Sequence, residues 1–186
     1  LGDCVAALNI RYGSQESIDF AEKMQLTMKN AAYQSSVDMA KELGSFPNYT
    51  WGNDIKSKFI QRLNEENPIL CKQMAKFGRR NMVLLTVAPT GSVSCMTQTT
   101  SGIEPAFMLE YKRRKKVNPS DNKVKVDFID QSGDSWQEFI VKHKGLQDWS
   151  NVTGDTDITK SPYYLATANE INWVNKTKLQ GAIQKH

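Results

Sequence analysis

A short segment near the middle of the chain combines small and hydroxylated residues as phosphate-binding loops do. It runs from Ala88 to Ser94 and reads Ala-Pro-Thr-Gly-Ser-Val-Ser. Gly91 allows the backbone to approach an anion closely. Thr90, Ser92 and Ser94 can donate hydroxyl hydrogen bonds. A helix after the loop would add its partly positive N-terminal amides, so the segment predicts a site that holds phosphate through neutral donors.

The segment differs from the nucleotide-binding loops that depend on a lysine. It contains no lysine, and the GxxxxGK[ST] pattern of the Walker-type loop does not occur in the chain. Turns are rich in Thr, Gly and Ser, so residue type alone favours a purely structural role. The phosphate-binding interpretation therefore needs support from the surrounding sequence.

The loop follows an apolar run, Met82 to Val87, that would have to position it. The run reads Met-Val-Leu-Leu-Thr-Val and lies between Asn81 and Pro89. It is short, partly β-branched and apolar on both alternating faces, which is typical of a buried strand in a parallel sheet. We therefore expect a buried strand that runs into the loop.

A long helix is predicted upstream, with Ser14 as its N-cap and Gly44 as its end. Glu16 lies near its positive end, where a carboxylate is favourable. Small and apolar residues recur at intervals of three and four, which indicates one buried face. The predicted face comprises Ile18, Ala21, Met24, Met28, Ala32, Ser35, Met39 and Leu43.

The other segments alternate between helical and extended patterns. Helical patterns cover a turn at 4–10, 54–64, 68–77 (after Asn67 and before Gly78), Ser135 to about Lys144, and the end of the chain from about Asn172. Extended patterns cover 107–115 and 123–129, with a turn at 118–122, and a polar stretch covers 147–160. Helices alternating with buried strands indicate an α/β fold.

Composition limits the class of protein. With 186 residues, of which 39% are hydrophobic, the chain predicts one compact unit or part of one, and no apolar run approaches the roughly 18 residues of a membrane span. The three cysteines show no CxxC spacing, which argues against a disulfide framework and a zinc site and favours a reducing cytoplasm. The first residues do not resemble a secretory signal, and the missing initial Met suggests an excised or processed segment.

The positive charge is concentrated in one run, Tyr-Lys-Arg-Arg-Lys-Lys from Tyr111 to Lys116. A solvated strand end or turn is the simpler interpretation, and a site for an anionic partner is the alternative. The net charge of +4 is too small to indicate a protein that binds nucleic acid directly.

The segment around the loop, taken whole, closely resembles the large subunits of ribonucleotide reductases. The resemblance is carried by Arg80-Asn81, by Leu-Leu-Thr-Val-Ala-Pro-Thr-Gly-Ser-Val-Ser at 84–94, and by Thr-Ser-Gly-Ile-Glu-Pro-Ala-Phe at 100–107. The Ala-Pro-Thr-Gly-Ser form is similar to that of the adenosylcobalamin-dependent class. Weaker similarities, in the same order as in the family, cover 8–12, 31–33, 40–47, 164–171 and 180–185, whereas 116–160 carry no motif that we can match.

The resemblance implies a fold and a site. Residues 1–186 would form a single segment of a ten-stranded α/β barrel, and the open strand edges of a partial barrel would make the isolated chain marginally stable or self-associating. The phosphate loop of the family maps onto Pro89, Thr90, Gly91, Ser92 and Val93. The implied partners are a ribonucleotide substrate, the remainder of the catalytic subunit and, when complete, a second copy of that subunit.

The resemblance also implies a radical mechanism. In this family a cysteine thiyl radical, generated here by homolysis of the cobalt–carbon bond of adenosylcobalamin, abstracts a ribose hydrogen, and two further cysteines supply electrons. The catalytic groups lie in an Asn-x-Cys-x-Glu motif that is absent from these residues, as is a C-terminal cysteine pair. We therefore expect no catalytic residue, no metal ligand and no reductase activity in this segment alone. The alternative is a non-catalytic module that binds a phosphorylated ligand through the loop or an acidic partner through 111–116.

Other residues that could do chemistry have simpler interpretations. Cys4, Cys71 and Cys95 are expected to pack as small apolar residues, since no local group would lower a thiol pKa. Glu104 could orient groups around a substrate or satisfy buried backbone donors. The two histidines, at 143 and 186, are not expected to bind metal or act as bases, and the tryptophans at 51, 136, 149 and 173 are expected to pack.

Overall fold

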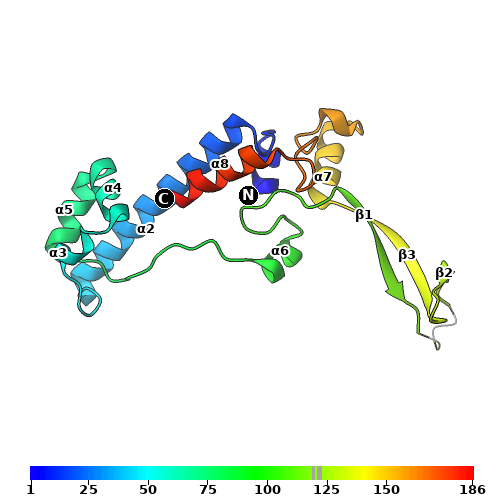
Figure 1. The fold of residues 1–186 in the computed structure, drawn as a ribbon, viewed down its shortest axis with the longest axis horizontal. Coiled ribbons are helices and arrows are strands. Elements are labelled where there is room, and N and C mark those ends of the chain that lie inside the picture. Colours follow the sequence, from blue (N-terminus) through cyan, green and yellow to red (C-terminus); the bar gives the residue numbers. More distant parts are fainter. Residues whose placement is uncertain (119, 121–122) are drawn as a thin grey trace. The chain divides into compact units, whose positions relative to one another are not determined.

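The computed structural model describes residues 1–118, 120 and 123–186, which divide into two compact units (Figure 1). Unit 1 comprises Leu1–Tyr12 and Thr90–Ile171, and unit 2 comprises Gly13–Pro89 and Asn172–His186. Two compact units thus form where the chain length predicts one. That all the residues form one segment of a barrel domain stays a prediction.

Unit 2 is built on the long helix α2 (Gln15–Leu43). The hydroxyl of Ser14 accepts a hydrogen bond from the Ser17 amide, and Gly44 ends the helix with a φ of 78°. A positive φ favours glycine, which explains this stop signal. The predicted bounds and caps of α2 are confirmed.

The predicted buried face of α2 is wrong beyond its first turns. Met28, Met39 and Leu43 are exposed, whereas Tyr33 and Val37 are buried. The apolar residues of α2 would allow more than one face of the helix to be buried. The helices α5 (Pro68–Phe77) and α8 (Trp173–Gln184) pack against α2 and determine which face it is.

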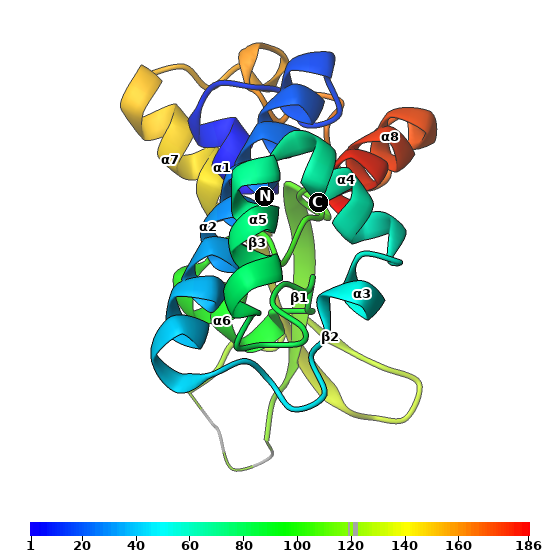
Figure 2. The same cartoon turned by 90° about the vertical axis from the view of Figure 1, so that its left-hand side faces the viewer.

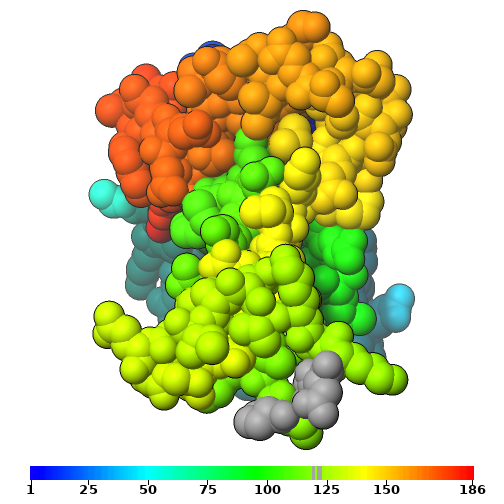
Figure 3. Space-filling model, turned by 90° about the vertical axis from the view of Figure 1, so that its right-hand side faces the viewer, coloured from blue at the N-terminus to red at the C-terminus, as the bar shows by residue number. Residues whose placement is uncertain are grey.

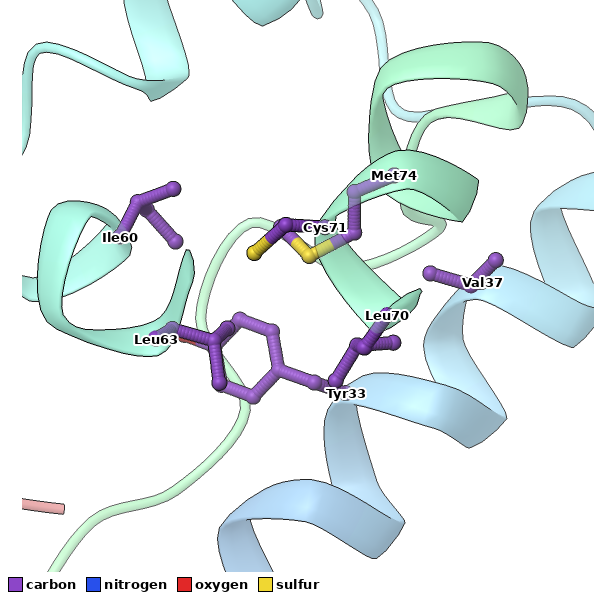
Figure 4. Close-up of a cluster of buried hydrophobic side chains, with 7 residues drawn as sticks. All are labelled: Tyr33, Val37, Ile60, Leu63, Leu70, Cys71 and Met74. Atoms are coloured by element: carbon purple, nitrogen blue, oxygen red, sulfur yellow. The ribbon is translucent and has the colours of Figure 1, made fainter. Parts of the chain in front are cut away.

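Short helices and α2 enclose the core of unit 2 (Figure 2). The predicted helix at 54–64 is two helices, α3 (Trp51–Asp54) and α4 (Lys58–Glu66). α5 and α8 begin directly after Asn67 and Asn172, as predicted. The side chains of these two residues accept backbone hydrogen bonds and so cap the helices. Figure 4 shows the buried cluster, which comprises Tyr33, Val37, Ile60, Leu63, Leu70, Cys71 and Met74.

A buried cation, Arg79, joins helix α3 to the segment that follows α5 in unit 2. Arg79 donates to both carboxylate oxygens of Asp54, at 3.1 Å from Nε and 2.7 Å from Nη2. It also donates to the carbonyl oxygens of Asn81 and Met82, at 2.9 and 2.5 Å. Burial opposes charge on Arg79, but the hydrogen bond and charge of Asp54 outweigh burial and raise the arginine pKa. Arg79 therefore stays charged and fixes the chain where it enters the segment before the loop.

The segment from Met82 to Val87 is not the predicted buried strand. It pairs with no described strand, and Val83 is 72% exposed while Leu84 packs against the core cluster. A strand needs neighbours to satisfy its backbone groups and cover its side chains. The described residues supply none for this segment, so it remains an extended connection with exposed apolar side chains.

Unit 1 contains the helices α1 (Gly2–Ala7), α6 (Gly91–Thr97) and α7 (Lys144–Thr153) and the 3-10 turn η1 (Ile158–Lys160). Its sheet contains β1 (Glu110–Lys116), β2 (Phe128–Ile129) and β3 (Ser135–Lys142), in the order β1-β3-β2 with antiparallel pairing. The sheet is therefore not the parallel one expected, and the described residues close no barrel. A mixture of helices and strands is nevertheless what an α/β sequence predicts.

Several predictions for unit 1 need correction. The helix predicted from Ser135 is the strand β3, because its alternating aromatic and β-branched residues pair along the length of β1. The helix in this region is α7, which begins where the predicted helix ends and occupies part of the predicted polar stretch. The two predicted strands are present but shorter, and the turn between them includes 119, 121 and 122, which lie outside the described residues.

One carboxylate joins the distant segments of unit 1. Asp3 Oδ1 lies 2.7 Å from His143 Nε2 and accepts a hydrogen bond of 2.9 Å from the Tyr163 hydroxyl. Asp3 Oδ2 accepts from the Thr100 amide at 2.8 Å. Burial alone would raise the Asp3 pKa, but the hydrogen bonds and charge of His143 and the hydrogen bonds of Tyr163 and Thr100 together lower it. Asp3 therefore stabilises unit 1 in its ionised form.

None of the described helices is long and apolar enough to cross a membrane.

Leu63→Ala should destabilise unit 2 by about 2–5 kcal/mol, because the Leu63 side chain is fully buried and its loss leaves a cavity. Ile69→Ala is the matched control, since Ile69 is 70% exposed and its truncation should cost under about 1 kcal/mol. Urea unfolding followed by circular dichroism measures both, and equal losses would contradict the assigned core.

Asp3→Asn should destabilise unit 1 by about 1–3 kcal/mol at neutral pH, because His143 and Tyr163 lose a charged acceptor. The folded state lowers the Asp3 pKa, so this stabilisation is present above the ordinary aspartate pKa of about 4 and is lost as pH falls through the lower, folded-state value.

Urea unfolding from pH 7 to 3 measures this effect, and the difference from the unsubstituted chain should shrink below pH 4. Asp148→Asn removes an exposed carboxylate paired with Lys144 and should cost at most about 0.5 kcal/mol. A pH-independent loss for Asp3→Asn would refute the assigned role of the carboxylate.

Candidate functional site

The predicted phosphate loop forms the start of helix α6. Thr90 is the N-cap residue, and its carbonyl oxygen accepts from the Ser94 amide at 2.9 Å. No side chain caps the helix, and the first amides of an α-helix have no partner within it. The amides of Gly91, Ser92 and Val93 are therefore available donors, whereas Pro89, which ends a stretch of unit 2, has no N–H to offer.

The Thr90 side chain links the loop to the Gly-Ile-Glu-Pro segment. Its hydroxyl oxygen accepts from the Gly102 amide at 3.2 Å and lies 3.3 Å from the Ser101 hydroxyl. The sequence placed these two motifs near each other along the chain but could not show this contact. A hydroxyl that accepts from Gly102 keeps its own hydrogen for Ser101 or for a ligand.

The predicted hydroxyl donors differ in their surroundings. Ser94 donates to the carbonyl oxygen of Gly91 at 2.8 Å, so its hydroxyl is used inside α6 and not at the end of the helix. The hydroxyl of Ser92 makes no hydrogen bond in the part of the chain that the structure describes, and the residue is exposed. Ser92 and Thr90 are thus the two hydroxyls that remain near the open amides.

Gly91 has no packing reason to be glycine among the described residues. A Cβ built on it would meet no atom within 4 Å, and its φ lies outside the positive range. Its neighbours in the loop are also exposed. The space beside this backbone is open, as the close approach of a ligand would require.

Residues of the N-terminal segment 1–12, which includes α1, hold the segment that contains Ser101 and Gly102, the two partners of Thr90. The Gly2 amide donates to the Glu104 carbonyl oxygen at 3.2 Å, and a Cβ on Gly2 would lie 2.8 Å from that oxygen. The Tyr12 hydroxyl donates to the Ile103 carbonyl oxygen at 2.6 Å. Burial, with a smaller contribution from the Glu104 charge, raises the pKa of Tyr12 to about 12, so it remains a donor. Glu104 itself is exposed and its carboxylate satisfies no buried backbone donor among the described residues.

The cysteines only partly match expectation. Cys71 is buried in the core cluster as predicted, and burial together with the charge of Asp54 raises its pKa to about 11. Cys4 and Cys95 are exposed, so the prediction that they pack as apolar residues is wrong. α6 is short and has solvent on its outer face, which leaves Cys95 without neighbours to pack against.

The tryptophan side chains differ in whether they pack or are exposed. Trp51 packs against the core of unit 2, and Trp136 stacks on Phe128 with ring centroids 6.5 Å apart. Trp173 is exposed on α8, with the Lys176 ammonium 4.6 Å from its ring centroid. Packing is therefore confirmed for Trp51 and Trp136 and wrong for Trp173.

Both histidines interact with other side chains. His143 contacts Asp3, and its ring lies edge-on to Tyr163 with centroids 5.3 Å apart. His186 Nδ1 lies 2.9 Å from the Nζ of Lys29, which is 1% exposed and also pairs with Glu66. Within the described residues, no three or more His, Cys, Asp or Glu side chains gather as a metal site would need.

Sequence reasoning missed a pocket of about 800 Å³ in unit 1. The pocket is lined by α1, α7, residues 97–100 and Tyr163. Asp3 is the contribution of α1 to its wall that carries a charge, and Trp149 is the aromatic ring that α7 contributes. Gly145 is required there, because a Cβ on it would lie 2.0 Å from the Tyr163 hydroxyl. No sequence signal could have indicated the pocket, since its walls come from segments far apart in the chain. It lies at the C-terminal end of α6, and the loop is at the other end.

The whole chain, residues 1–186, matches the family described as the barrel domain of ribonucleotide reductase. Among curated proteins, it is 28% identical over 192 residues to a vitamin B12-dependent ribonucleoside-diphosphate reductase of Mycobacterium tuberculosis, an alignment that covers 100% of this chain and 24% of that protein. It is 29% identical over 115 residues to a ribonucleoside-diphosphate reductase subunit alpha of Treponema pallidum, which covers 60% of this chain and 14% of the relative.

A vitamin B12-dependent ribonucleoside-diphosphate reductase of Thermoplasma acidophilum is 28% identical over 111 residues, which covers 60% of this chain and 12% of the relative. The chain thus spans about a quarter of the length of the curated relatives that it matches from end to end. Because the family match extends over all its residues, the chain belongs to the ribonucleotide reductase barrel domain family.

Proposed function

We propose that this chain is part of the catalytic subunit of a ribonucleotide reductase and supplies the loop that holds the phosphates of the substrate. The observation that carries the proposal is the group of open donors at the start of α6, in a segment that lies within the family match. The whole protein would reduce ribonucleotides to deoxyribonucleotides. This segment would contribute binding and no catalytic residue.

The loop would hold phosphate without a positively charged side chain. The amides of Gly91, Ser92 and Val93 point along the axis of α6, where the partial charge of the helix end favours an anion. The hydroxyls of Thr90 and Ser92 add two donors beside them. Pro89 fixes the backbone where the chain enters the loop.

The remainder of the catalytic subunit would complete the fold around this segment. Met82 to Val87 leave an extended backbone without ladder partners, and Val83 and Val87 are exposed. Strands from the missing part of the subunit would satisfy those backbone groups and cover those side chains. In the complete protein this segment would therefore become the barrel strand that leads into the loop, and the complete subunit would pair with a second copy.

The cofactor of the whole protein would be adenosylcobalamin, as the vitamin B12-dependent relatives suggest. When bound, it would supply the radical that starts reduction. Neither imidazole of the chain is placed to ligate a cobalt ion, since His143 Nε2 contacts Asp3 and both ring nitrogens of His186 are buried beside Lys29 and Glu22. We therefore assign neither imidazole, and no other described residue, to the cofactor.

Thr90→Ala combined with Ser92→Ala should weaken binding of a ribonucleoside diphosphate by about 100-fold or more, because each hydroxyl bond to a charged group is worth about 1.5–3 kcal/mol. Calorimetric titration measures the affinity. Thr97→Ala is the control, since the Thr97 hydroxyl donates to the Val93 carbonyl oxygen inside α6. Unchanged affinity in the double variant would exclude the loop as the phosphate site.

The purified chain alone should show no reductase activity, because the catalytic cysteines of the family are not among its residues. Activity should appear when the chain is mixed with an upstream segment that carries the Asn-x-Cys-x-Glu motif, a ribonucleotide, adenosylcobalamin and a dithiol reductant. Formation of deoxyribonucleotide measures the outcome. The upstream segment alone is the control, and a mixture that neither assembles nor turns over would contradict the proposed split of roles.

A further inference from the structure

Strand β1 lies at an edge of the sheet in unit 1 and contains the whole cationic run, Tyr111 to Lys116. The sheet order β1-β3-β2 leaves one side of β1 without a partner among the described residues. All seven residues of β1 are exposed. In Figure 3 the sheet is the yellow-green surface in the lower half of the view. The backbone of this edge is therefore open to an added strand.

The cations of β1 divide between the two faces of the sheet. Side chains alternate along a strand, so Lys112, Arg114 and Lys116 share one face. Lys112 and Arg114 each lie 2.9 Å from a carboxylate oxygen of Glu138, and Lys116 lies 2.5 Å from one of Asp134. All three cations of this face are therefore paired with carboxylates of the sheet or of the turn before β3.

The cations on the other face of β1 have no acidic partner opposite them. Arg113 and Lys115 lie opposite Phe139 and Gln137 of β3, neither of which is acidic. Across the described residues, neither cation takes part in an ion pair. Tyr111 is on the same face, and Tyr111 and Phe139 are 41% and 37% exposed. This face thus offers two cations beside two partly exposed aromatic rings.

The charge of the edge selects the kind of strand that could pair with it. A second copy of β1 would bring five cations against five, and like charges opposite each other on paired strands are destabilising. Cations on an edge strand commonly prevent self-pairing for this reason. An acidic strand would meet the opposite effect, because its carboxylates at every second position would match the spacing of Arg113 and Lys115.

We propose that the free edge of β1 is a docking site for an extended acidic segment of a partner protein, which would add to the sheet as a fourth strand. Backbone hydrogen bonds along β1 supply sequence-independent affinity, and Arg113 and Lys115 select for negative charge. The acidic side chains of the added strand lie on the same face as Tyr111, and the apolar side chains that alternate with them lie on the opposite face, with Lys112 and Arg114. This interaction is independent of the phosphate loop.

A single-stranded nucleic acid could also use cations and aromatic rings. An acidic strand fits better, because the open feature of β1 is its alternating row of backbone donors and acceptors, which the backbone of a peptide matches and that of a nucleic acid does not. The two aromatic rings are also more than half covered, which leaves little flat surface for bases to stack on.

Fluorescence anisotropy of the purified chain with a labelled Glu-Val-Glu-Val-Glu-Val peptide tests the proposal. Arg113→Glu combined with Lys115→Glu should weaken binding by about tenfold or more, since two favourable cross-strand pairs become repulsive. Lys72→Glu combined with Lys178→Glu is the control. It makes the same change in charge at exposed positions of unit 2 and should change the affinity less than about twofold.

A second peptide separates strand addition from simple charge attraction. Replacing the central valine by proline keeps the charge but removes a ladder hydrogen bond, so binding should weaken by about tenfold. Equal binding of the two peptides, or no effect of the Arg113 and Lys115 variant, would overturn the proposal. So would an oligothymidylate of equal charge that binds more tightly than the peptide and displaces it.

Discussion

The organisation of unit 1 depends on the carboxylate of Asp3. Its two oxygens contact the Thr100 amide, His143 and the Tyr163 hydroxyl, which come from segments separated by most of the chain. The Asp3 side chain is 12% exposed, so little water is available to replace a lost partner. A carboxylate with these hydrogen bonds stabilises the packing only while it is charged, and its lowered pKa keeps it charged.

Buried charges play a comparable part in unit 2. Lys29 is among the least exposed residues of α2, where it pairs with Glu66 and contacts His186. Arg79 pairs with Asp54 and binds two carbonyl oxygens of the following segment. Each buried cation tolerates few alternative positions, because an unpaired charge in the core is costly. The Lys29–Glu66 pair joins α2 to α4 and favours burial of this face of α2, a choice that its apolar pattern leaves open.

The sequence predicted the features whose signals are local. Ser14, Asn67 and Asn172 marked helix starts, and Gly44 and Gly78 marked helix ends, because caps act within a few residues. Strands depend on partners elsewhere in the chain. Residues 82–87 have the composition of a strand but no pairing strand among the described residues. Residues 135–142 have the pattern of a capped helix, yet they form a strand because they pair with β1. The contact of Thr90 with Gly102, and the pocket beside Asp3, are likewise beyond any local pattern.

The two ends of α6 explain how a loop without a lysine could serve as an anion site. At its start, Thr90 accepts from Gly102, and the segment after Gly102 is held by Gly2 and Tyr12. Just beyond its end, Thr100 exchanges hydrogen bonds with Asp3. Neutral donors bind an anion well only if they already point at it, because each carries a small partial charge. The contacts with Gly2, Asp3 and Tyr12 supply that orientation, and they make the proposed phosphate loop dependent on the N-terminal end of the chain.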